Sequence, residues 1–229
     1  MDLLLHTPPL GVYEHMALDE TLVRLRPQEI TLRFYRWTPA PAVTFGCSQF
    51  IADVRRALTQ QHFSGAYCRR PTGGGVVFHR NDLTFSLIFP SAQKPSAVYE
   101  ELHTLIRVFL GEGAYLLGGK QPAAAYAPHT PTGANACFVN PVQNDLLDRG
   151  GTKILGGAIR RFGQTVLYQG SLQLPDAREN TRYKHALLEA ARHFTGKTLR
   201  PRRADQTTLA QAATLAQTRY ATAAWTERF

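Results

Sequence analysis

The stretch Arg69-Arg70-Pro71-Thr72-Gly73-Gly74-Gly75-Val76-Val77-Phe78-His79 decides most of what the chain reveals about its fold. Two arginines precede three glycines, and an apolar run typical of a strand follows them. Glycine permits positive φ and lets another group approach the backbone closely, at an entropic cost that a plain strand does not require. The stretch therefore predicts a strand edge opened for a ligand, with cationic side chains beside it. A glycine turn between two strands, with solvated arginines, is the alternative interpretation.

A second stretch, Lys153-Ile154-Leu155-Gly156-Gly157-Ala158-Ile159-Arg160-Arg161, again joins a cation to small residues inside a strand-like run. The small residues leave room above the strand for a substrate, which a purely structural strand does not need. A lysine that faces solvent from a strand is the alternative interpretation of Lys153.

The two motifs occur together with Cys137-Phe138 and an early run, His15-Met16-Ala17-Leu18-Asp19-Glu20. In this order they resemble the superfamily of lipoate–protein ligases, octanoyltransferases and biotin ligases, over nearly the whole chain as far as Tyr220 and Trp225. Pro71-Thr72-Gly73-Gly74, and His79 followed by Leu83-Thr84-Phe85-Ser86, are most similar to the cysteine-dependent octanoyltransferase branch.

Hydrophobic periodicity predicts helices over Tyr13–Arg26, Ala52–His62, Ser96–Leu110, Tyr183–Phe194 and Thr207–Ala224. It predicts strands over Ile30–Trp37, Ala42–Cys47, Ala66–Arg70, Val76–Phe78, Leu83–Phe89, Asp145–Leu147, Lys153–Arg161 and Thr165–Leu174. This order indicates an α+β fold with a mixed, mostly antiparallel sheet and flanking helices. The resemblance implies the biotin/lipoate ligase catalytic fold, related to class II aminoacyl-tRNA synthetases. We expect one such domain over residues 1–229, without the C-terminal accessory domain of many ligases.

Composition narrows the class of protein. Hydrophobic residues make up 44% of the chain, which is ordinary for a soluble globular protein. No apolar run approaches the roughly 18 residues that span a bilayer, and residues 1–6 lack secretory-signal features, so we expect a cytoplasmic protein that does not enter membranes. Three widely spaced cysteines without a CxxC pair argue against disulfides and against a metal site.

The net charge of +9 favours acidic partners. No zinc-finger spacing, RNA-binding aromatic signature or basic zipper supports nucleic acid as the partner. The densest basic cluster, Arg200–Arg203, is expected to be a solvated surface. Acidic carrier proteins fit the charge and are also what the resemblance implies.

Cys137 is the candidate nucleophile, because it lies in an irregular region, residues 118–136 and just beyond, ahead of the lysine motif. Cys47 and Cys68 lie inside apolar strand runs and are expected to be buried fillers. A thiolate is the reactive species, and a nearby ammonium favours it. We therefore assign Lys153 to thiol activation and to polarisation of the acyl carbonyl.

The remaining candidate residues are expected to bind substrate. The glycines would form a wall for an acyl chain, and the arginine would orient a phosphopantetheine arm or, in a ligase, nucleotide phosphates. The histidine is a supporting residue at a strand end. The set is Arg70, Gly73, Gly74, Gly75, His79, Gly156, Gly157 and Ala158. Asp19 and Glu20 on the early helix are expected to be structural.

The resemblance implies a protein acyltransferase that takes an octanoyl or lipoyl group from an acyl carrier protein through a Cys137 thioester. The acceptor would be a lysine of a lipoyl domain or of the glycine-cleavage H protein, and no cofactor would be needed. An ATP-dependent lipoate–protein ligase, using ATP and magnesium, is the alternative, and Gly75 is more ligase-like. A basic binding module without catalysis is a third interpretation, against which the presence of both Cys137 and Lys153 argues.

Overall fold

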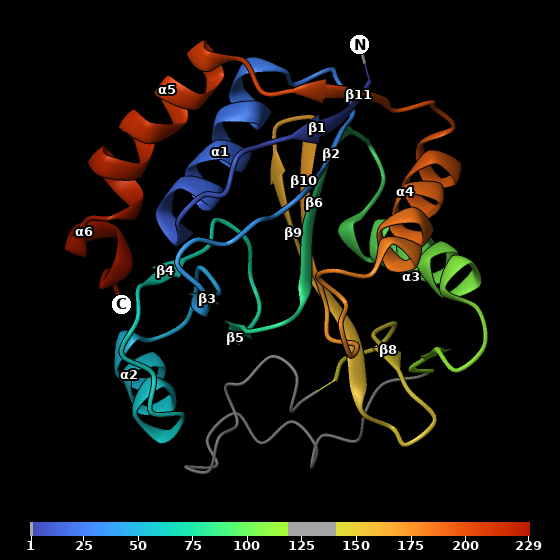
Figure 1. Cartoon of the computed structure of the whole chain (residues 1–229), viewed down its shortest axis with the longest axis horizontal. Helices are drawn as coiled ribbons and strands as arrows, with labels where there is room; N and C mark the ends of the chain where they lie inside the picture. The colour runs from blue at the N-terminus through green and yellow to red at the C-terminus, as the bar shows by residue number, and fades with distance from the viewer. Residues whose placement is uncertain (1, 119–140) are drawn as a thin grey trace.

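Two sheets organise the computed structural model, which describes residues 2–118 and 141–229 (Figure 1). The larger sheet has eight strands, in the order β11 (Arg200–Arg203), β1 (Leu3–His6), β2 (Thr31–Phe34), β6 (Leu83–Pro90), β10 (Thr165–Leu172), β9 (Lys153–Phe162), β8 (Leu146–Leu147) and β7 (Tyr115–Leu116). The smaller sheet has the order β4 (Tyr67–Arg69), β3 (Ala42–Phe45) and β5 (Val76–His79). In the described part of the larger sheet, only the pairings of β1 with β11 and with β2 are parallel. The predicted mixed, mostly antiparallel sheet is confirmed.

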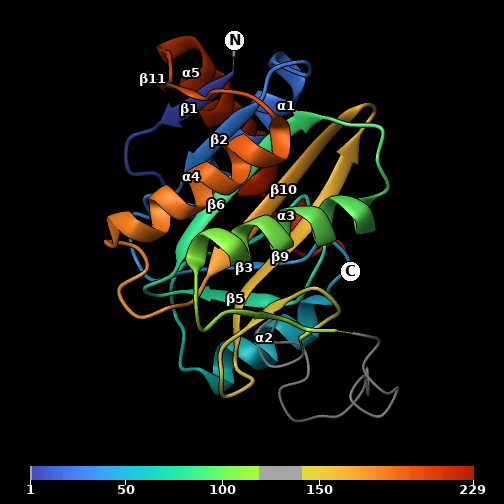
Figure 2. The ribbon, with the colours of Figure 1, turned by 90° about the vertical axis from the view of Figure 1, so that its right-hand side faces the viewer.

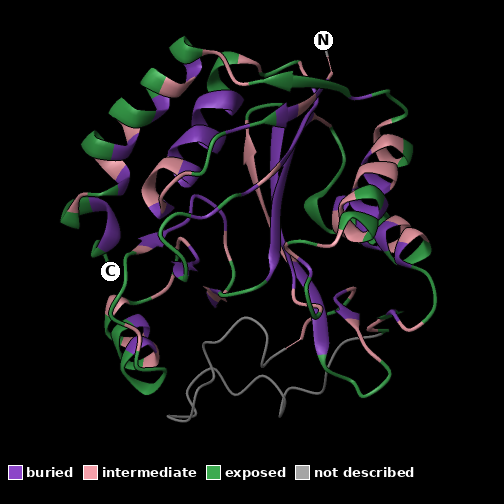
Figure 3. Ribbon diagram, in the orientation of Figure 1, coloured by how far each residue is buried: buried purple, intermediate pink, exposed green. Residues whose placement is uncertain are grey.

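Helices cover both faces of the larger sheet. Helices α1 (Val12–Leu25) and α5 (Gln206–Leu215) pack together on one face, and α3 (Pro95–Leu110) and α4 (Thr181–Thr195) lie side by side on the other (Figure 2). Helix α2 (Ile51–Gln60) packs against the smaller sheet. The middle strands are buried along most of their length, while the outer sides of α4 and α5 are exposed (Figure 3). None of the helices in the described ranges is long and apolar enough to cross a membrane.

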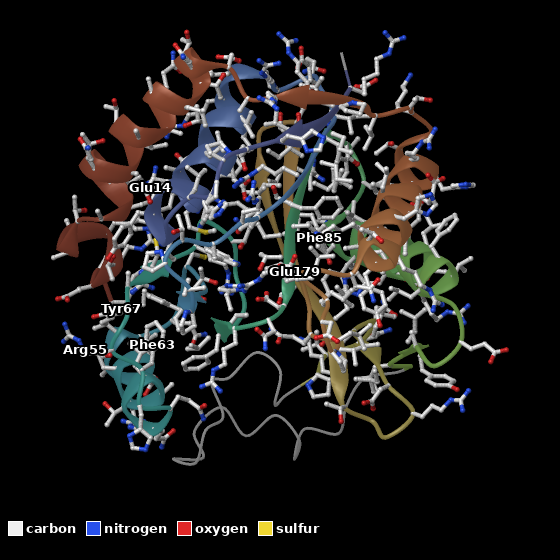
Figure 4. The ribbon with its side chains drawn as sticks, in the orientation of Figure 1. Glu14, Arg55, Phe63, Tyr67, Phe85 and Glu179 are labelled. Carbon is white, nitrogen blue, oxygen red and sulfur yellow. The ribbon has the colours of Figure 1, made fainter. Side chains whose placement is uncertain are left out.

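Helix α3 shows how the sequence specifies one of these layers. Pro95 occupies its first turn, where a missing backbone N–H costs nothing. Val98, Leu102 and Ile106 follow at a spacing of four and are buried against the sheet. Gly111 ends the helix with φ of +84°. On the sheet, the ring of Phe85 lies near the centre of the molecule and packs on Tyr168 in the adjacent strand (Figure 4).

The C-terminal region differs from the single helix predicted over Thr207–Ala224. Helix α5 stops at Leu215, a π-turn spans Ala216–Tyr220, and a short helix α6 covers Ala223–Thr226. The break occurs because the Thr222 side chain accepts a hydrogen bond from the Trp225 N–H and so begins a new helix. The turn places the Tyr220 hydroxyl 2.5 Å from Glu20 of α1.

Three strands of the larger sheet, β1, β7 and β11, were missed by the sequence prediction. The basic cluster Arg200–Arg203, expected to be only a solvated surface, is exposed but forms β11 beside β1. An all-polar run with a proline carries no alternating pattern, and such residues are typical of edge strands because they discourage pairing with other chains. Cys47 also departs from the prediction: β3 ends at Phe45, and Cys47 lies half-exposed in the following turn, whereas Cys68 is buried as expected.

Arg69 ties the C-terminal segment to the smaller sheet. Its fully buried guanidinium donates to the Thr226 carbonyl at 2.8 Å and to the Gln49 carbonyl at 2.7 Å. Nε donates to the Trp225 carbonyl at 3.1 Å, and the Nη1 that binds Gln49 also donates to the Cys47 carbonyl at 3.1 Å. Arg69 therefore acts as a structural cross-link, whereas the adjacent Arg70 turns to the opposite side of the strand.

Arg69→Lys is expected to destabilise the fold by about 3 kcal/mol, because one ammonium cannot replace a planar fork that reaches several carbonyls. Urea unfolding measures the change. Arg56→Lys is the matched control: Arg56 is exposed and pairs with Asp53 at 3.0 Å, so its substitution is expected to cost less than about 0.5 kcal/mol. Equal stability of the two variants would contradict the cross-linking role.

Candidate active site

A pocket lies between the smaller sheet and the middle strands of the larger one. It contains about 410 Å³ of atom-free space, which includes open solvent at its mouth. Its wall combines aliphatic and aromatic side chains, the backbone of small residues and a few polar groups. The lining residues are Met16, Tyr35, Trp37, Thr44, Arg70, Val77, His79, Thr84, Gly156, Gly157, Ala158, Gln169, Gly170 and Ser171.

Arg70, Thr44 and His79 form a hydrogen-bonded row along one wall. The Arg70 guanidinium donates to Thr44 Oγ1 at 2.9 Å, and the same oxygen lies 2.8 Å from His79 Nε2. The His79 ring stacks on Trp37, with 4.4 Å between the ring centroids. All four side chains are buried, so the row presents fixed polar groups to the pocket.

Asp82 lies behind His79 and fixes its orientation. One carboxylate oxygen of Asp82 is 2.8 Å from His79 Nδ1 and accepts from the hydroxyls of Ser171 at 2.6 Å and Thr84 at 2.7 Å. Burial acts to raise the pKa of Asp82, but the His79 ring and these hydrogen bonds outweigh burial and lower the pKa. The carboxylate is therefore ionised near neutral pH, and His79 carries its donating proton on Nδ1.

The glycine triplet wraps around Arg70. The guanidinium donates to the carbonyls of Gly73 at 2.7 Å and Gly75 at 3.0 Å. Gly74 has φ of +89°, and a Cβ on Gly46 would lie 1.9 Å from the Gly74 oxygen, so this turn needs glycine on both sides. The sequence predicted that the triplet forms a wall with its N–H groups toward substrate. The carbonyls of Gly73 and Gly75 bind the guanidinium, and none of the three glycines is among the lining residues of the pocket. Their part in binding substrate stays a prediction.

Lys153 begins β9 and runs along the strand to Gly156. A Cβ on Gly156 would lie 2.3 Å from Lys153 Cε and 2.5 Å from Nζ, so only glycine leaves room for this path. The ammonium lies 2.9 Å from a carboxylate oxygen of Asp145. Both side chains are buried, which excludes the solvent-facing alternative. Gly156 is paired with Ser171, a pocket residue, so a Cβ on Gly156 would point to the pocket face of the sheet, and the ammonium lies on that face beside the pocket.

Gln169 joins the smaller sheet to the floor of the pocket. Its carbonyl oxygen accepts from Thr72 Oγ1 at 2.6 Å, and its amide donates to Asp19 at 2.7 Å. Asp19 is fully buried and pairs with Arg33 at 2.8 Å. The early carboxylates thus hold structure, as expected: Glu20 likewise accepts from Arg219 at 2.8 Å.

The structure brings together most of the predicted site residues. Arg70, His79 and the segment 156–158 line one pocket, and Lys153 adjoins it. Cys137 lies outside the described residues. The sequence prediction missed several buried polar residues that lie inside or beside apolar strands. A polar side chain in such a place needs a hydrogen-bond partner, and this signal could have pointed to them. They are Thr44, Asp82, Asp145, Gln169 and Ser171. In the described ranges, no group of three or more histidine, cysteine and acidic residues is placed to hold a metal ion.

Comparison with known proteins identifies the family to which this arrangement belongs. The model for the lipoyl protein ligase A/B catalytic domain matches residues 11–211. The chain belongs to this family. The match includes the arginine–glycine motif, Cys137 and the lysine motif.

Curated relatives indicate a branch of the family. Octanoyltransferase LipM of Symbiobacterium thermophilum is 34% identical over 174 residues, which cover 70% of this chain and 61% of the relative. Octanoyltransferase LipM of Oceanobacillus iheyensis is 32% identical over 182 residues, or 74% of this chain and 63% of the relative. The matched part therefore spans about three fifths of each relative's length.

Solved structures confirm the fold. A lipoate-protein ligase A bound with ATP superposes with a TM-score of 0.73 at 19% identity, covering 98% of both chains. A bipartite lipoate protein ligase from Thermoplasma acidophilum, studied with its E2 lipoyl domain, gives a TM-score of 0.71 at 19% identity, over 99% of this chain and 96% of that one. The lipoyl protein ligase catalytic fold predicted from the motifs is confirmed.

His103, on the far side of β9 and β10 from the pocket, makes the stability of the site depend on pH. It is fully buried, with Nδ1 2.7 Å from the Asn144 carbonyl and Nε2 2.8 Å from the Tyr168 hydroxyl. Burial, with a smaller effect from the Lys153 charge, lowers the pKa of His103 to about 3. The ring is therefore neutral near pH 7.

Stability is expected to decline on acidification through this histidine. Its pKa returns to roughly 6.5 on unfolding, so the unfolded chain binds more protons between that value and the folded pKa. The stabilisation is complete above the unfolded pKa and falls with pH by up to about 1.4 kcal/mol per unit. His103→Gln should flatten the slope of unfolding free energy against pH by that amount, measured in urea, whereas His185→Gln, at an exposed position, should not. An unaltered slope in His103→Gln would contradict the assignment.

Proposed function

We propose that this chain is a protein acyltransferase that moves an octanoyl or lipoyl group from a carrier-protein thioester to a lysine of another protein. The acceptor would be a lipoyl domain or the glycine-cleavage H protein, and the donor an acyl carrier protein. The observation that carries the proposal is a largely apolar pocket lined by Gly156 to Ala158, with the buried ammonium of Lys153 beside Gly156. The names of the curated relatives point to octanoyl as the group transferred.

The pocket suits an acyl chain with one polar end. Met16, Trp37 and Val77 offer apolar surface, and the glycine backbone allows a chain to lie close to the strand. The polar groups, among them Arg70 and His79, gather along one wall. An acyl group would thus lie in the apolar part with its carbonyl directed toward the polar side.

The transfer proceeds in two steps in this proposal. The Cys137 thiolate attacks the carrier thioester, a new carbon–sulfur bond forms, and the carrier thiolate leaves and takes up a proton. The acceptor lysine, as a neutral amine, then attacks the Cys137 thioester; an amide forms, the Cys137 sulfur leaves, and the amine proton passes to it or to solvent. Because the donor thioester already stores the required energy, neither ATP nor another cofactor is consumed.

Lys153 is proposed to act in a different way from an isolated cation. Its ammonium forms an ion pair with Asp145, so the two charges largely cancel at a distance. The contribution to catalysis is then a directed N–H donor near the pocket wall, which stabilises negative charge on the acyl oxygen as it develops.

Mass spectrometry of the intact protein tests the covalent step. Incubation with octanoyl-carrier protein and no nucleotide is expected to add one octanoyl group, which hydroxylamine removes and which disappears when apo lipoyl domain is added. Cys137→Ser should abolish the hydroxylamine-sensitive adduct. Cys47→Ser is the matched control, because Cys47 is the half-exposed thiol of the described residues.

A ligase would behave differently in the same experiment. It would stay unmodified by the octanoyl-carrier, would require free acid, ATP and magnesium, and would release pyrophosphate. That result would overturn the transferase proposal in favour of the ligase. An adduct that persists in Cys137→Ser and vanishes in Cys47→Ser would show that Cys47, and not Cys137, is the nucleophile.

Lys153→Ala is expected to lower kcat of the transfer by about 10² to 10³, the usual scale for a lost oxyanion donor. The variant also leaves Asp145 buried without its counter-ion, which destabilises the fold. The double variant Lys153→Ala/Asp145→Asn removes both charges and should recover stability in urea without recovering kcat. Recovery of both would show that Lys153 has only a structural role.

A further inference from the structure

Tyr99 of α3 contacts both sides of the lysine motif, yet it stands in none of the motifs that point to function. Its hydroxyl donates to Asp145 Oδ1 at 2.6 Å and accepts the Gly157 backbone N–H at 3.0 Å. Asp145 uses its other oxygen for the Lys153 ammonium. One hydroxyl thus joins the carboxylate of the ion pair to the backbone of a residue that lines the pocket.

The β-sheet explains why Gly157 needs this partner. The pairing of β8 with β9 ends at Leu146 and Leu155, so the strand edge beyond Leu155 has no neighbouring strand in the described residues. The Gly157 N–H lies past that end, and Tyr99 supplies the acceptor that a longer β8 would have supplied. The hydroxyl therefore fixes the pocket wall where the sheet no longer does.

His103, one helical turn after Tyr99, holds the same segment at a second point. The two rings are in contact, with 3.9 Å between their centroids, and His103 binds the Asn144 carbonyl. The backbone N–H of Val142 also donates to Asp145, at 2.6 Å. Asp145 is therefore held by α3, by its own loop and by Lys153, and its place relative to Gly157 is set by Tyr99.

The chemistry of Tyr99 matches this role. Burial, and next the charge of Asp145, raise the pKa of Tyr99 well above its usual value. The hydroxyl thus keeps its proton and remains a donor to the carboxylate. The titratable groups that face Asp145 are Lys153 from β9 and Tyr99 from α3, with His103 and Tyr168 next to them.

We propose that Tyr99 is a positioning residue for the acyl transfer, because its hydroxyl fixes the Asp145–Lys153 ion pair against the pocket wall at Gly157. The inference rests on the proposed function for its catalytic consequence. Tyr99 acts through other residues in this proposal, since Tyr99 is not one of the residues that line the pocket.

Tyr99→Phe keeps the ring and removes only the hydroxyl. We expect kcat for octanoyl transfer to fall by about 10- to 100-fold, the scale on which small misplacements act, with KM for the carrier changed by less than about twofold. Exchange of the Gly157 amide hydrogen should become faster.

Tyr220→Phe is the matched control, because Tyr220, like Tyr99, donates to a buried carboxylate, here Glu20, which lies away from the pocket. Tyr220→Phe should cost similar stability in urea and leave kcat and amide exchange at Gly157 unaltered. Equal kcat values for the two variants, or a loss confined to KM, would overturn the positioning role.

Two further readouts separate this inference from the proposed function. Wild-type protein that fails to transfer octanoyl from a carrier would refute the proposed function. In that case, amide exchange at Gly157 and the rate at which Lys153 reacts with an amine reagent still test the structural link. Faster reaction at both positions in Tyr99→Phe, but not in Tyr220→Phe, would support the link, and unaltered rates would refute it.

Discussion

The pocket depends on an ion pair that no solvent reaches. Arg33 of β2 and Asp19 of α1 are both fully buried, and they meet at 2.8 Å beneath the pocket floor. Such a pair is costly to bury and is maintained only when the remaining donors and acceptors are satisfied. Here Ser86 and Gln169 add hydrogen bonds to Asp19, at 2.8 and 2.7 Å. A helix and three strands are thus brought to one carboxylate.

The pair also determines the state of its neighbour. His15 Nδ1 lies 3.0 Å from the Arg33 guanidinium, and Nε2 lies 3.1 Å from the Arg36 carbonyl. Burial, and next the Arg33 charge, lower the pKa of His15 well below its usual value. The ring is therefore neutral, and its Nδ1 accepts from Arg33. The uncharged histidine and the paired arginine together leave the pocket floor without a net charge.

Much of this architecture is readable from residues. The helix of α3 follows from Val98, Leu102 and Ile106 on one face, and the central strands from apolar runs such as β6. The sequence did not reveal β11, because Arg200–Arg203 offers no alternation and is paired only through its backbone to β1.

The part of the site that could be predicted is the part in which a motif fixes the relative positions of its own residues. A lysine followed by glycines predicted open space above a strand, and the structure shows that Lys153 itself occupies the space above Gly156. Asp145 could not be inferred as its partner, since the contact requires β8 to turn back onto β9. The hydrogen bonds from Arg70 to the carbonyls of Gly73 and Gly75 could not be inferred either, because they depend on where the Arg70 side chain points.

Adjacent arginines divide two tasks by strand geometry alone. Arg69 donates hydrogen bonds to the carbonyls of Trp225 and Thr226 in the C-terminal segment, while the Arg70 side chain lines the pocket. A substitution near the end of the chain can thereby disturb the pocket, because Arg69 and the pocket residue Arg70 are adjacent in the backbone. In a mutational scan, substitutions in the last helix and substitutions in the pocket would therefore show similar effects, although the last helix does not line the pocket. Selection on substrate use would then constrain residues far from any substrate.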